Sequence, residues 1–104
     1  MEITLQHFND CPNWLTAMER IERVVEARGI DADVRVQLIN TPEAAEAYDF
    51  RGSPTMLING TDPFAAPDAP VGLSCRVYLT PDGMAGSPTI DQISTALTNI
   101  GATS

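Results

Sequence analysis

The sequence contains no lysine, and this absence limits the partners that the chain can bind. Its six basic residues are all arginines and stand against 14 acidic residues, so the formal net charge is −8. Nucleic-acid binding needs clustered positive charge along the phosphate backbone, and adsorption to anionic lipid needs the same clustering. We therefore expect neither nucleic acid nor a membrane surface among the partners.

Long apolar runs and a basic N-terminal signal are also missing. No segment approaches the ~20 apolar residues that span a bilayer, and residues 1–4 open directly into a strand-like pattern. A chain of 104 residues is long enough for one domain and too short for two. We expect a cytoplasmic protein that folds as a single domain over residues 1–104 and remains a monomer.

Cysteine is scarce, with only Cys11 and Cys75 in the chain. A cytoplasmic setting keeps such residues reduced, so we interpret both as thiols. One histidine and two cysteines do not complete a four-ligand structural zinc site, and an iron–sulfur cluster needs four cysteines. We therefore expect no metal and no cofactor.

Hydrophobic periodicity predicts seven secondary-structure elements in the order β-α-β-α-β-β-α. Thr41 followed by Pro42 is typical of a helix start, and Thr89 with Gln92 forms a capping box. Asn59-Gly60 and Pro81-Asp82-Gly83 are turn sequences. The predicted strands cover residues 3–8, 34–38, 55–58 and 76–79. The predicted helices cover residues 12–28, 42 to 47 or 49, and 90–100, with Gly101 ending the last one.

The order of the elements predicts an α/β fold with a four-stranded mixed sheet. The first βαβ unit requires parallel strands, and the last two strands are expected to form an antiparallel hairpin. This gives the strand order 2-1-3-4, with strand 4 antiparallel and helices on both faces. The first and last helices should share one face. Residues 61–74 contain three prolines and are predicted to form a long loop.

Cys11 is the strongest candidate for chemistry. If Pro12 is the first helical residue, Cys11 is the N-cap and faces the free N–H groups and positive dipole end of the first turn. This position stabilises a thiolate, which is the nucleophilic form of cysteine. The sequence therefore predicts a reactive thiol at Cys11.

Two segments resemble motifs of the thioredoxin family. Residues 8–14, Phe-Asn-Asp-Cys-Pro-Asn-Trp, lie where that family has its Cys-x-x-Cys, with Trp14 at the second cysteine position. Residues 52–58, Gly-Ser-Pro-Thr-Met-Leu-Ile, resemble its cis-proline segment. The resemblance implies a thioredoxin-like fold, a cis Pro54, and an exposed Ser53 backbone that holds an extended peptide or a thiol ligand. The implied substrate groove consists of Pro12, Trp14, Ser53, Pro54 and Thr55.

A narrower resemblance concerns three short peptides. Asp-Pro-Phe at residues 62–64, Leu-Ser-Cys-Arg at residues 73–76 and the Gly-Ser-Pro-Thr segment are similar to small thioredoxin-like proteins often catalogued as alkylmercury-lyase-like. Because Trp14 replaces the second cysteine, dithiol exchange within one Cys-x-x-Cys motif is excluded.

Cys75 is the only other thiol, so it is a second candidate catalytic residue that resolves an oxidised Cys11. A regular hairpin, however, would place Cys75 at the start of strand 4, at the far end from Cys11. Several residues at about 3.3 Å each exceed the ~5.5 Å Cα separation that a disulfide prefers. We expect the two cysteines to lie apart unless the loop at residues 61–74 relocates Cys75, in which case they pair.

The leading hypothesis is thiol-based redox chemistry, either thiol–disulfide exchange by an oxidoreductase or thiol sensing. Cys11 would attack, Pro54 would shape the groove, and the partner would be a protein or a low-molecular-weight thiol or disulfide. One alternative is an organomercurial-handling protein in which Cys11 and Cys75 hold mercury and Asp10 supplies a proton. The other is a non-catalytic thioredoxin-like binding module.

Overall fold

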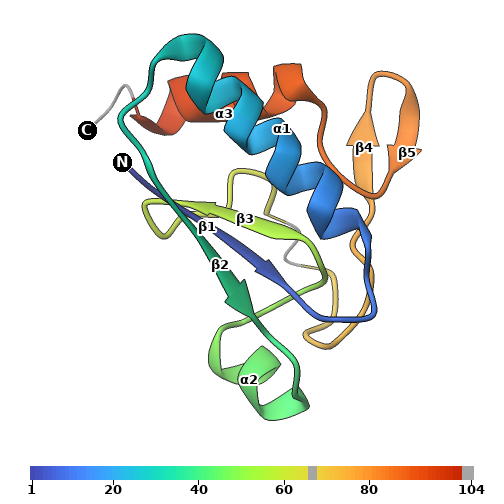
Figure 1. Ribbon diagram of the computed structural model, residues 1–104. Helices are drawn as coiled ribbons and strands as arrows, with labels where there is room; N and C mark the ends of the chain where they lie inside the picture. The colour runs from blue at the N-terminus through green and yellow to red at the C-terminus, as the bar shows by residue number, and fades with distance from the viewer. Residues whose placement is uncertain (66–67, 102–104) are drawn as a thin grey trace.

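The structure is a computed structural model that describes residues 1–65 and 68–101. A three-stranded sheet lies under two helices, and a small hairpin stands apart from that sheet (Figure 1). In the described part of the chain, every helix is too short or too polar to cross a lipid bilayer. The elements are β1 (Glu2–His7), α1 (Asn13–Arg28), β2 (Asp33–Leu38), α2 (Pro42–Ala47), β3 (Thr55–Ile58), β4 (Tyr78–Thr80), β5 (Gly83–Ala85) and α3 (Ile90–Gly101).

The main sheet has the strand order β2-β1-β3. β1 and β2 are parallel, with Ile3 opposite Val34, and β3 runs antiparallel to β1, with Ile58 opposite Ile3. The predicted parallel first pair and the central position of the first strand are therefore confirmed. Apolar residues alternate with polar ones along β1, so one face of the sheet points into the core.

The prediction of a fourth strand in this sheet was wrong. β4 pairs with β5 in a separate two-stranded sheet, closed by the predicted turn at Pro81 and Asp82. The physical reason lies upstream of β4, where Cys75 forms a parallel bridge with Ser53. The returning chain meets the residues that precede β3 and does not run back beside β3 itself, so no hairpin forms between them.

The prediction of helices on both faces was also wrong. α1 and α3 pack together on the same face of the sheet, as expected, but α2 lies beyond its end (Figure 1). α2 has six residues, of which only Ala45 is buried, so its apolar surface is too small to cover a sheet face. The opposite face carries polar side chains, including the hydrogen-bonded pair Gln6 and Gln37.

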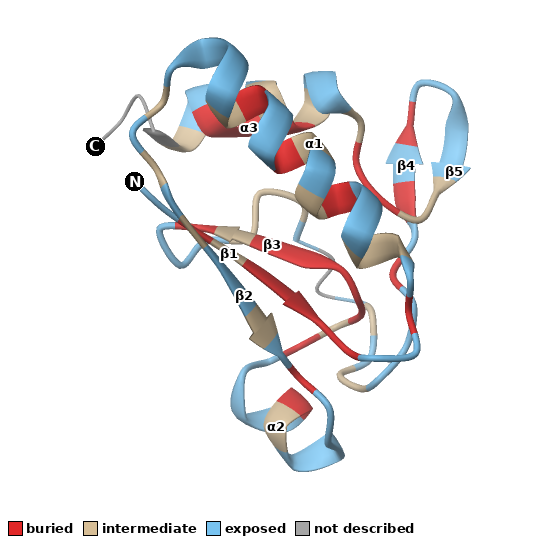
Figure 2. Ribbon diagram, viewed as in Figure 1, coloured by how far each residue is buried: buried red, intermediate tan, exposed pale blue. Residues whose placement is uncertain are grey.

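Two buried clusters hold the fold together, and Figure 2 shows buried residues in β1, β3, α1 and α3. The smaller cluster lies beyond the end of β1 and includes Cys11, which positions this thiol inside the protein. The larger cluster consists of Ile3, Leu5, Ala17, Ile21, Val24, Met56, Ile58, Ile93, Ala96 and Leu97. The smaller one consists of Phe8, Cys11, Ile39, Ala45 and Phe50.

Two of the three helices begin at the N-cap residue that the sequence predicts. The Ala44 N–H donates to Thr41 Oγ1 at 3.1 Å, which confirms Thr41 as the cap of α2. The Thr89 and Gln92 side chains each accept the other's backbone N–H, which confirms the capping box of α3. α1, by contrast, begins at Asn13 with Pro12 as its N-cap, so Cys11 precedes the cap by one residue.

The capping box provides a test of how α3 is held. Thr89→Ala removes the hydroxyl that accepts the Gln92 N–H, and we expect the free energy of unfolding to fall by about 1 kcal/mol. Urea denaturation followed by circular dichroism measures the change. The control is Thr98→Ala, the same substitution at an exposed site of the same helix, where alanine should be neutral or slightly stabilising. Equal destabilisation by both variants would contradict the capping role.

Candidate functional site

The two cysteines, 64 residues apart in sequence, lie next to each other in the structure. The Cys75 thiol donates a hydrogen bond to the Cys11 sulfur, and the two sulfurs are 3.0 Å apart. Both cysteines are free thiols. The expectation that Cys75 lies far from Cys11 was wrong, because it assumed a regular hairpin between the third and fourth strands. The long loop relocates Cys75, which was the exception stated for that expectation.

Cys75 reaches Cys11 because residues 72–76, here called the Cys75 segment, run parallel to residues 50–53. The Gly72 N–H donates to the Phe50 carbonyl at 3.0 Å. The Ser53 N–H donates to the Ser74 carbonyl, and the Arg76 N–H donates to the Ser53 carbonyl, each at 2.8 Å. Ser53 and Cys75 are therefore paired directly across this short parallel contact.

Gly52 allows the Cys75 segment to come this close. Its φ is +125°, a backbone conformation that residues with a side chain rarely adopt. A Cβ atom at Gly52 would lie 2.9 Å from the Arg76 Cβ and 3.1 Å from the Arg76 Cα. Any side chain here would therefore push the Cys75 segment away from residues 50–53.

Arg76 anchors the far end of the Cys75 segment. Its guanidinium forms a 2.8 Å ion pair with Asp62, in which the arginine side chain is 5% exposed and the aspartate 23% exposed. The same guanidinium donates to Thr55 Oγ1 at 3.2 Å and to the Phe64 carbonyl. It also lies 4.7 Å from the centre of the Tyr78 ring. These contacts fix the residue next to Cys75.

Cys11 is fully buried in the smaller core cluster. Its thiol donates to the Ser53 carbonyl at 3.4 Å, and its sulfur accepts from Cys75. The result is a relay of hydrogen bonds from Cys75 through Cys11 to the Ser53 carbonyl. Because Cys11 has no exposed surface, an external reagent cannot reach its sulfur while the pair is in this arrangement.

Cys75, in contrast, is exposed. The pKa of its thiol is raised above its ordinary value, first because the thiol donates a hydrogen bond to Cys11. Desolvation and the negative charge that Cys11 carries when ionised raise the pKa of Cys75 further. At neutral pH the accessible thiol therefore stays protonated, and a thiolate at Cys75 forms only as the pH rises.

The Ser53–Pro54 peptide bond is cis, as predicted. The groove expected around it is closed, however. Ser53 and Pro54 are fully buried, and both backbone hydrogen-bonding groups of Ser53 already bind the Cys75 segment. The expectation of an exposed Ser53 backbone was wrong, because the chain's own residues 74–76 occupy the place predicted for an extended ligand.

The other predicted groove residues are spread around this closed site. The Thr55 side chain is buried and its hydroxyl donates to the Gly52 carbonyl at 2.6 Å. Pro12 is exposed, and Trp14 is half-buried. The Trp14 ring stacks on His7, with the ring centres 4.0 Å apart. These residues do not form one open groove, and in the described structure Cys11 itself has no exposed surface.

Asp62, Arg76 and Tyr78 support the thiol pair but were not recognised from their chemistry in the sequence. Asp62 and Arg76 are 14 residues apart with no periodic pattern between them, so only the fold shows that they pair. The available signal was the pair of short peptides that contain them, Asp-Pro-Phe and Leu-Ser-Cys-Arg, which pointed to a resemblance and not to a contact.

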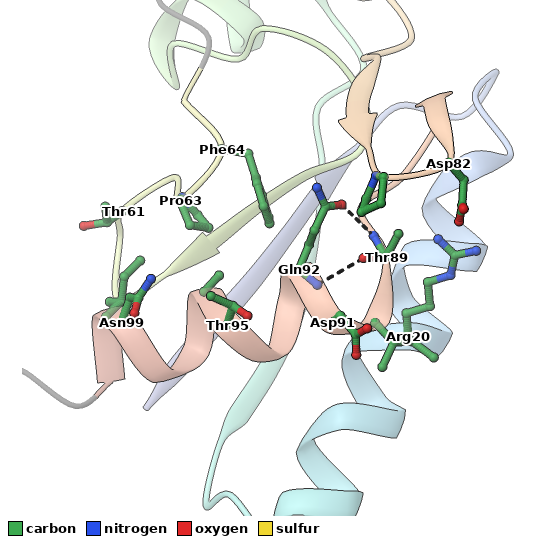
Figure 3. Close-up of a pocket in the computed structure, with 14 residues that line it drawn as sticks. Arg20, Thr61, Pro63, Phe64, Asp82, Thr89, Asp91, Gln92, Thr95 and Asn99 are labelled. Carbon is green, nitrogen blue, oxygen red and sulfur yellow. Dashed lines mark hydrogen bonds between the residues drawn. The ribbon is translucent and has the colours of Figure 1, made fainter.

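A separate groove of about 1090 Å³ lies along the exposed side of α3. Figure 3 shows Thr95 and Asn99 of α3 on one side of it and Pro63 and Phe64 on the other. Phe64 also meets Tyr78 edge to face, with ring centres 5.5 Å apart. The groove therefore shares one wall with the contacts that anchor Arg76, but it contains neither cysteine.

Metal binding finds little support around the two sulfurs. Within residues 1–65 and 68–101, no group of three or more potential histidine, cysteine or carboxylate ligands is found. Asp10 is exposed, and in the same described residues it makes no hydrogen bond with either sulfur.

Comparison with known proteins gives no match to a family model, a curated protein or a solved structure. Function must then be argued from the chemistry of the site, because a general fold class is compatible with many activities. The chemistry available is that of two adjacent thiols, one buried and one exposed. Their burial and hydrogen bonding decide which of the two reacts with an external molecule.

The raised pKa of Cys75 provides a test of the sulfur–sulfur contact. Cys11→Ala removes the acceptor of the Cys75 hydrogen bond, so the pKa of Cys75 should fall towards its ordinary value. The rate of Cys75 alkylation by iodoacetamide, followed from about pH 7 to pH 11 with mass spectrometry, reports this pKa. We expect the midpoint to move to lower pH in the variant.

Cys11→Ser is the control for this measurement, because its hydroxyl keeps a hydrogen-bond acceptor in place. Its midpoint should lie between those of the wild type and Cys11→Ala. A midpoint that is the same in all three proteins would mean that the two sulfurs do not interact in solution.

Proposed function

We propose that Cys11 and Cys75 form a redox-active dithiol that converts reversibly to an internal disulfide. The observation that carries this proposal is the 3.0 Å distance between the two sulfurs. A disulfide bond is about 2.05 Å long, so closing it requires the sulfurs to approach by about 1 Å. The hydrogen bonds along the Cys75 segment hold Cys75 where that small movement is sufficient.

The reaction with an external disulfide takes place in two exchange steps. The Cys75 thiolate, having lost its proton to solvent, attacks one sulfur of the external disulfide, forming a mixed disulfide and releasing one external thiolate. Deprotonated Cys11 then attacks the Cys75 sulfur and displaces the second external thiolate. The two thiolates released take up the two protons lost by the cysteines. The protein dithiol is oxidised by two electrons, and the external disulfide is reduced to two thiols.

The burial of the two sulfurs supports this order of events. Cys75 is exposed and meets the external disulfide first, whereas buried Cys11 is shielded and serves as the resolving thiol. This reverses the order expected from the sequence, in which Cys11 attacks. A mixed disulfide on Cys75 places its sulfur within reach of Cys11, so resolution is intramolecular and is favoured by proximity.

The raised pKa of Cys75 favours thiol sensing over rapid catalysis. Because only the thiolate attacks, a mostly protonated Cys75 reacts slowly at neutral pH. A dithiol that reacts slowly but closes efficiently once attacked suits a protein that records the redox state of its surroundings. The relevant partners are then the low-molecular-weight thiols and disulfides of the cytoplasm, where we propose that the protein acts.

A relationship to the thioredoxin family is part of the same proposal. The parallel pair β1 and β2, the cis bond before Pro54 and the position of Cys11 ahead of α1 support it. The main sheet has three strands, however, and the second thiol comes from the Cys75 segment. In this view the second cysteine of a Cys-x-x-Cys pair is replaced by one from a distant part of the chain.

The two alternatives derive less support from the site. Two adjacent sulfurs suit a soft metal such as mercury, but that alternative needs an acid beside the bound carbon as well, and no contact in the described residues ties Asp10 to the pair. A binding module that uses a groove at Pro54 is disfavoured, because Pro54 is buried and the Ser53 backbone is occupied. The redox proposal needs only the two thiol hydrogen bonds to give way to the disulfide, and the backbone hydrogen bonds of the Cys75 segment can stay in place.

Oxidation of the purified protein tests the proposal directly. Mild treatment with a small disulfide should yield a monomer that has lost two hydrogen atoms and has no titratable thiol, because both cysteines are joined. Mass spectrometry of a proteolytic digest should identify a peptide pair linked through Cys11 and Cys75. A disulfide across this 64-residue separation should also stabilise the protein to urea by up to about 4 kcal/mol.

Single-cysteine variants separate the roles of the two thiols. Cys11→Ser should accumulate a stable mixed disulfide on Cys75, whereas Cys75→Ser should react slowly because Cys11 is buried. If the wild type instead forms only disulfide-linked dimers, or if Cys75→Ser reacts as fast as Cys11→Ser, the proposed pair and its order of attack are incorrect.

Gly52→Ala should impair closure of the disulfide without removing either sulfur. The new Cβ would collide with Arg76 and displace the Cys75 segment, so the step from mixed to internal disulfide should slow by about tenfold or more. Quenched-flow mass spectrometry measures that step. Gly60→Ala is the matched control, since Gly60 also has a positive φ (+84°) but a Cβ there meets nothing within 4 Å. Equal slowing in both variants would refute the role of close approach at Gly52.

A further inference from the structure

The exposed thiol belongs to a stripe of apolar side chains that continues into the small hairpin. Burial alternates along residues 76–80, with Arg76 and Tyr78 inside and Val77 and Leu79 outside. Side chains two residues apart in an extended chain share a face, so Cys75, Val77 and Leu79 lie on the same exposed side. Met84 of β5 is directly opposite Leu79. We call Cys75, Val77, Leu79 and Met84 the Cys75 stripe.

The three apolar members of the Cys75 stripe are unusually exposed. Val77 is 58% exposed, Met84 68% and Leu79 74%. Leu79 and Met84 belong to the hairpin that stands apart from the main sheet, and Val77 directly precedes it (Figure 1). Contiguous exposed apolar side chains cost free energy in water and commonly mark a contact site. Here the apolar side chains adjoin the one thiol of the pair that an external molecule can reach.

Charge and hydrogen bonding narrow the class of molecule that fits there. The formal net charge of −8 repels anionic disulfides and lowers their rate of encounter. The backbone of Ser53, expected to hold an extended peptide, is already bound on both sides by Ser74 and Arg76. The ion pair between Arg76 and Asp62 opposes displacement of these residues. An anionic molecule or a peptide that needs the Ser53 backbone is therefore disfavoured.

We infer that the disulfide substrate of Cys75 is a small molecule without negative charge and with apolar groups, which pack on Val77, Leu79 and Met84 during the exchange. This inference rests on the proposed dithiol function and specifies its substrate class. The reaction has the two steps given above, with the external disulfide as oxidant and two apolar thiols as products. Contact with the stripe lowers the barrier for attack at Cys75 and does not alter resolution by Cys11.

Three small disulfides with alkyl thiol leaving groups test the inference: dipropyl disulfide, bis(2-hydroxyethyl) disulfide and glutathione disulfide. Each rate of reaction with the wild-type protein is divided by the rate with free N-acetylcysteine, which cancels the intrinsic reactivity of the probe. We expect the normalised rate for dipropyl disulfide to exceed that for glutathione disulfide by about tenfold, with the hydroxyethyl compound between them.

The variants Val77→Ser and Leu79→Ser should remove most of the difference in normalised rate between dipropyl disulfide and the uncharged hydroxyethyl compound, because the two probes differ in apolar surface and not in charge. Val36→Ser is the matched control, because Val36 is 45% exposed on β2, a strand outside the hairpin. If the internal disulfide forms but the protein shows no preference for dipropyl disulfide, the inferred substrate class is wrong and the dithiol function stands. The same holds if Val77→Ser, Leu79→Ser and Val36→Ser all lose that preference equally. Failure of every probe to produce an internal disulfide overturns the proposed function as well.

Discussion

The ion pair between Arg76 and Asp62 is the interaction on which the thiol site depends. A guanidinium that is almost fully buried needs a charged partner, and removing that partner lowers the free energy of unfolding by about 3–5 kcal/mol. Asp62, Thr55 and the Phe64 carbonyl together bind it, and Tyr78 covers one side of it. Because Arg76 follows Cys75 directly, fixing the arginine also fixes the second thiol beside the first.

The same anchor explains why the chain does not form a larger sheet. The Cys75 segment is held against residues 50–53, upstream of β3, by backbone hydrogen bonds and by the close approach at Gly52. From there the chain leads away into the β4–β5 hairpin, which therefore stands outside the main sheet. The hairpin exposes Val77, Leu79 and Met84, so the position of the second thiol and the exposed apolar stripe have a common structural origin.

The two adjacent thiols differ in their exposure and in their hydrogen bonding. Cys11 is buried in an apolar cluster and is held by the Ser53 carbonyl, whereas Cys75 is exposed and carries the raised pKa. Cys75 is therefore accessible but mostly protonated at neutral pH, whereas Cys11 is shielded from solvent and lies next to it. Under the proposed function, this division assigns the first reaction to one sulfur and the closure of the disulfide to the other.

Local sequence determined much of the framework, because the signals involved span only a few residues. The cap at Thr41 and the capping box at Thr89 are decided by nearby hydrogen bonds, and β1 has a buried apolar face, whereas β2 pairs with β1 without burying any residue fully. The cis bond before Pro54 was expected from a resemblance between motifs and is present. Cys11 was correctly placed between the first strand and the first helix, although one residue before the cap.

The tertiary structure alone decided how the two cysteines meet. Contacts between residues distant in sequence bring Cys11 and Cys75 together and occupy the backbone of Ser53. They also place β4 in a separate hairpin instead of in the main sheet. The decisive contact joins Arg76 to Asp62, and no local pattern encodes it. A buried charge selects its partner from whatever the folded chain brings within reach, so its consequences can be recognised only in three dimensions.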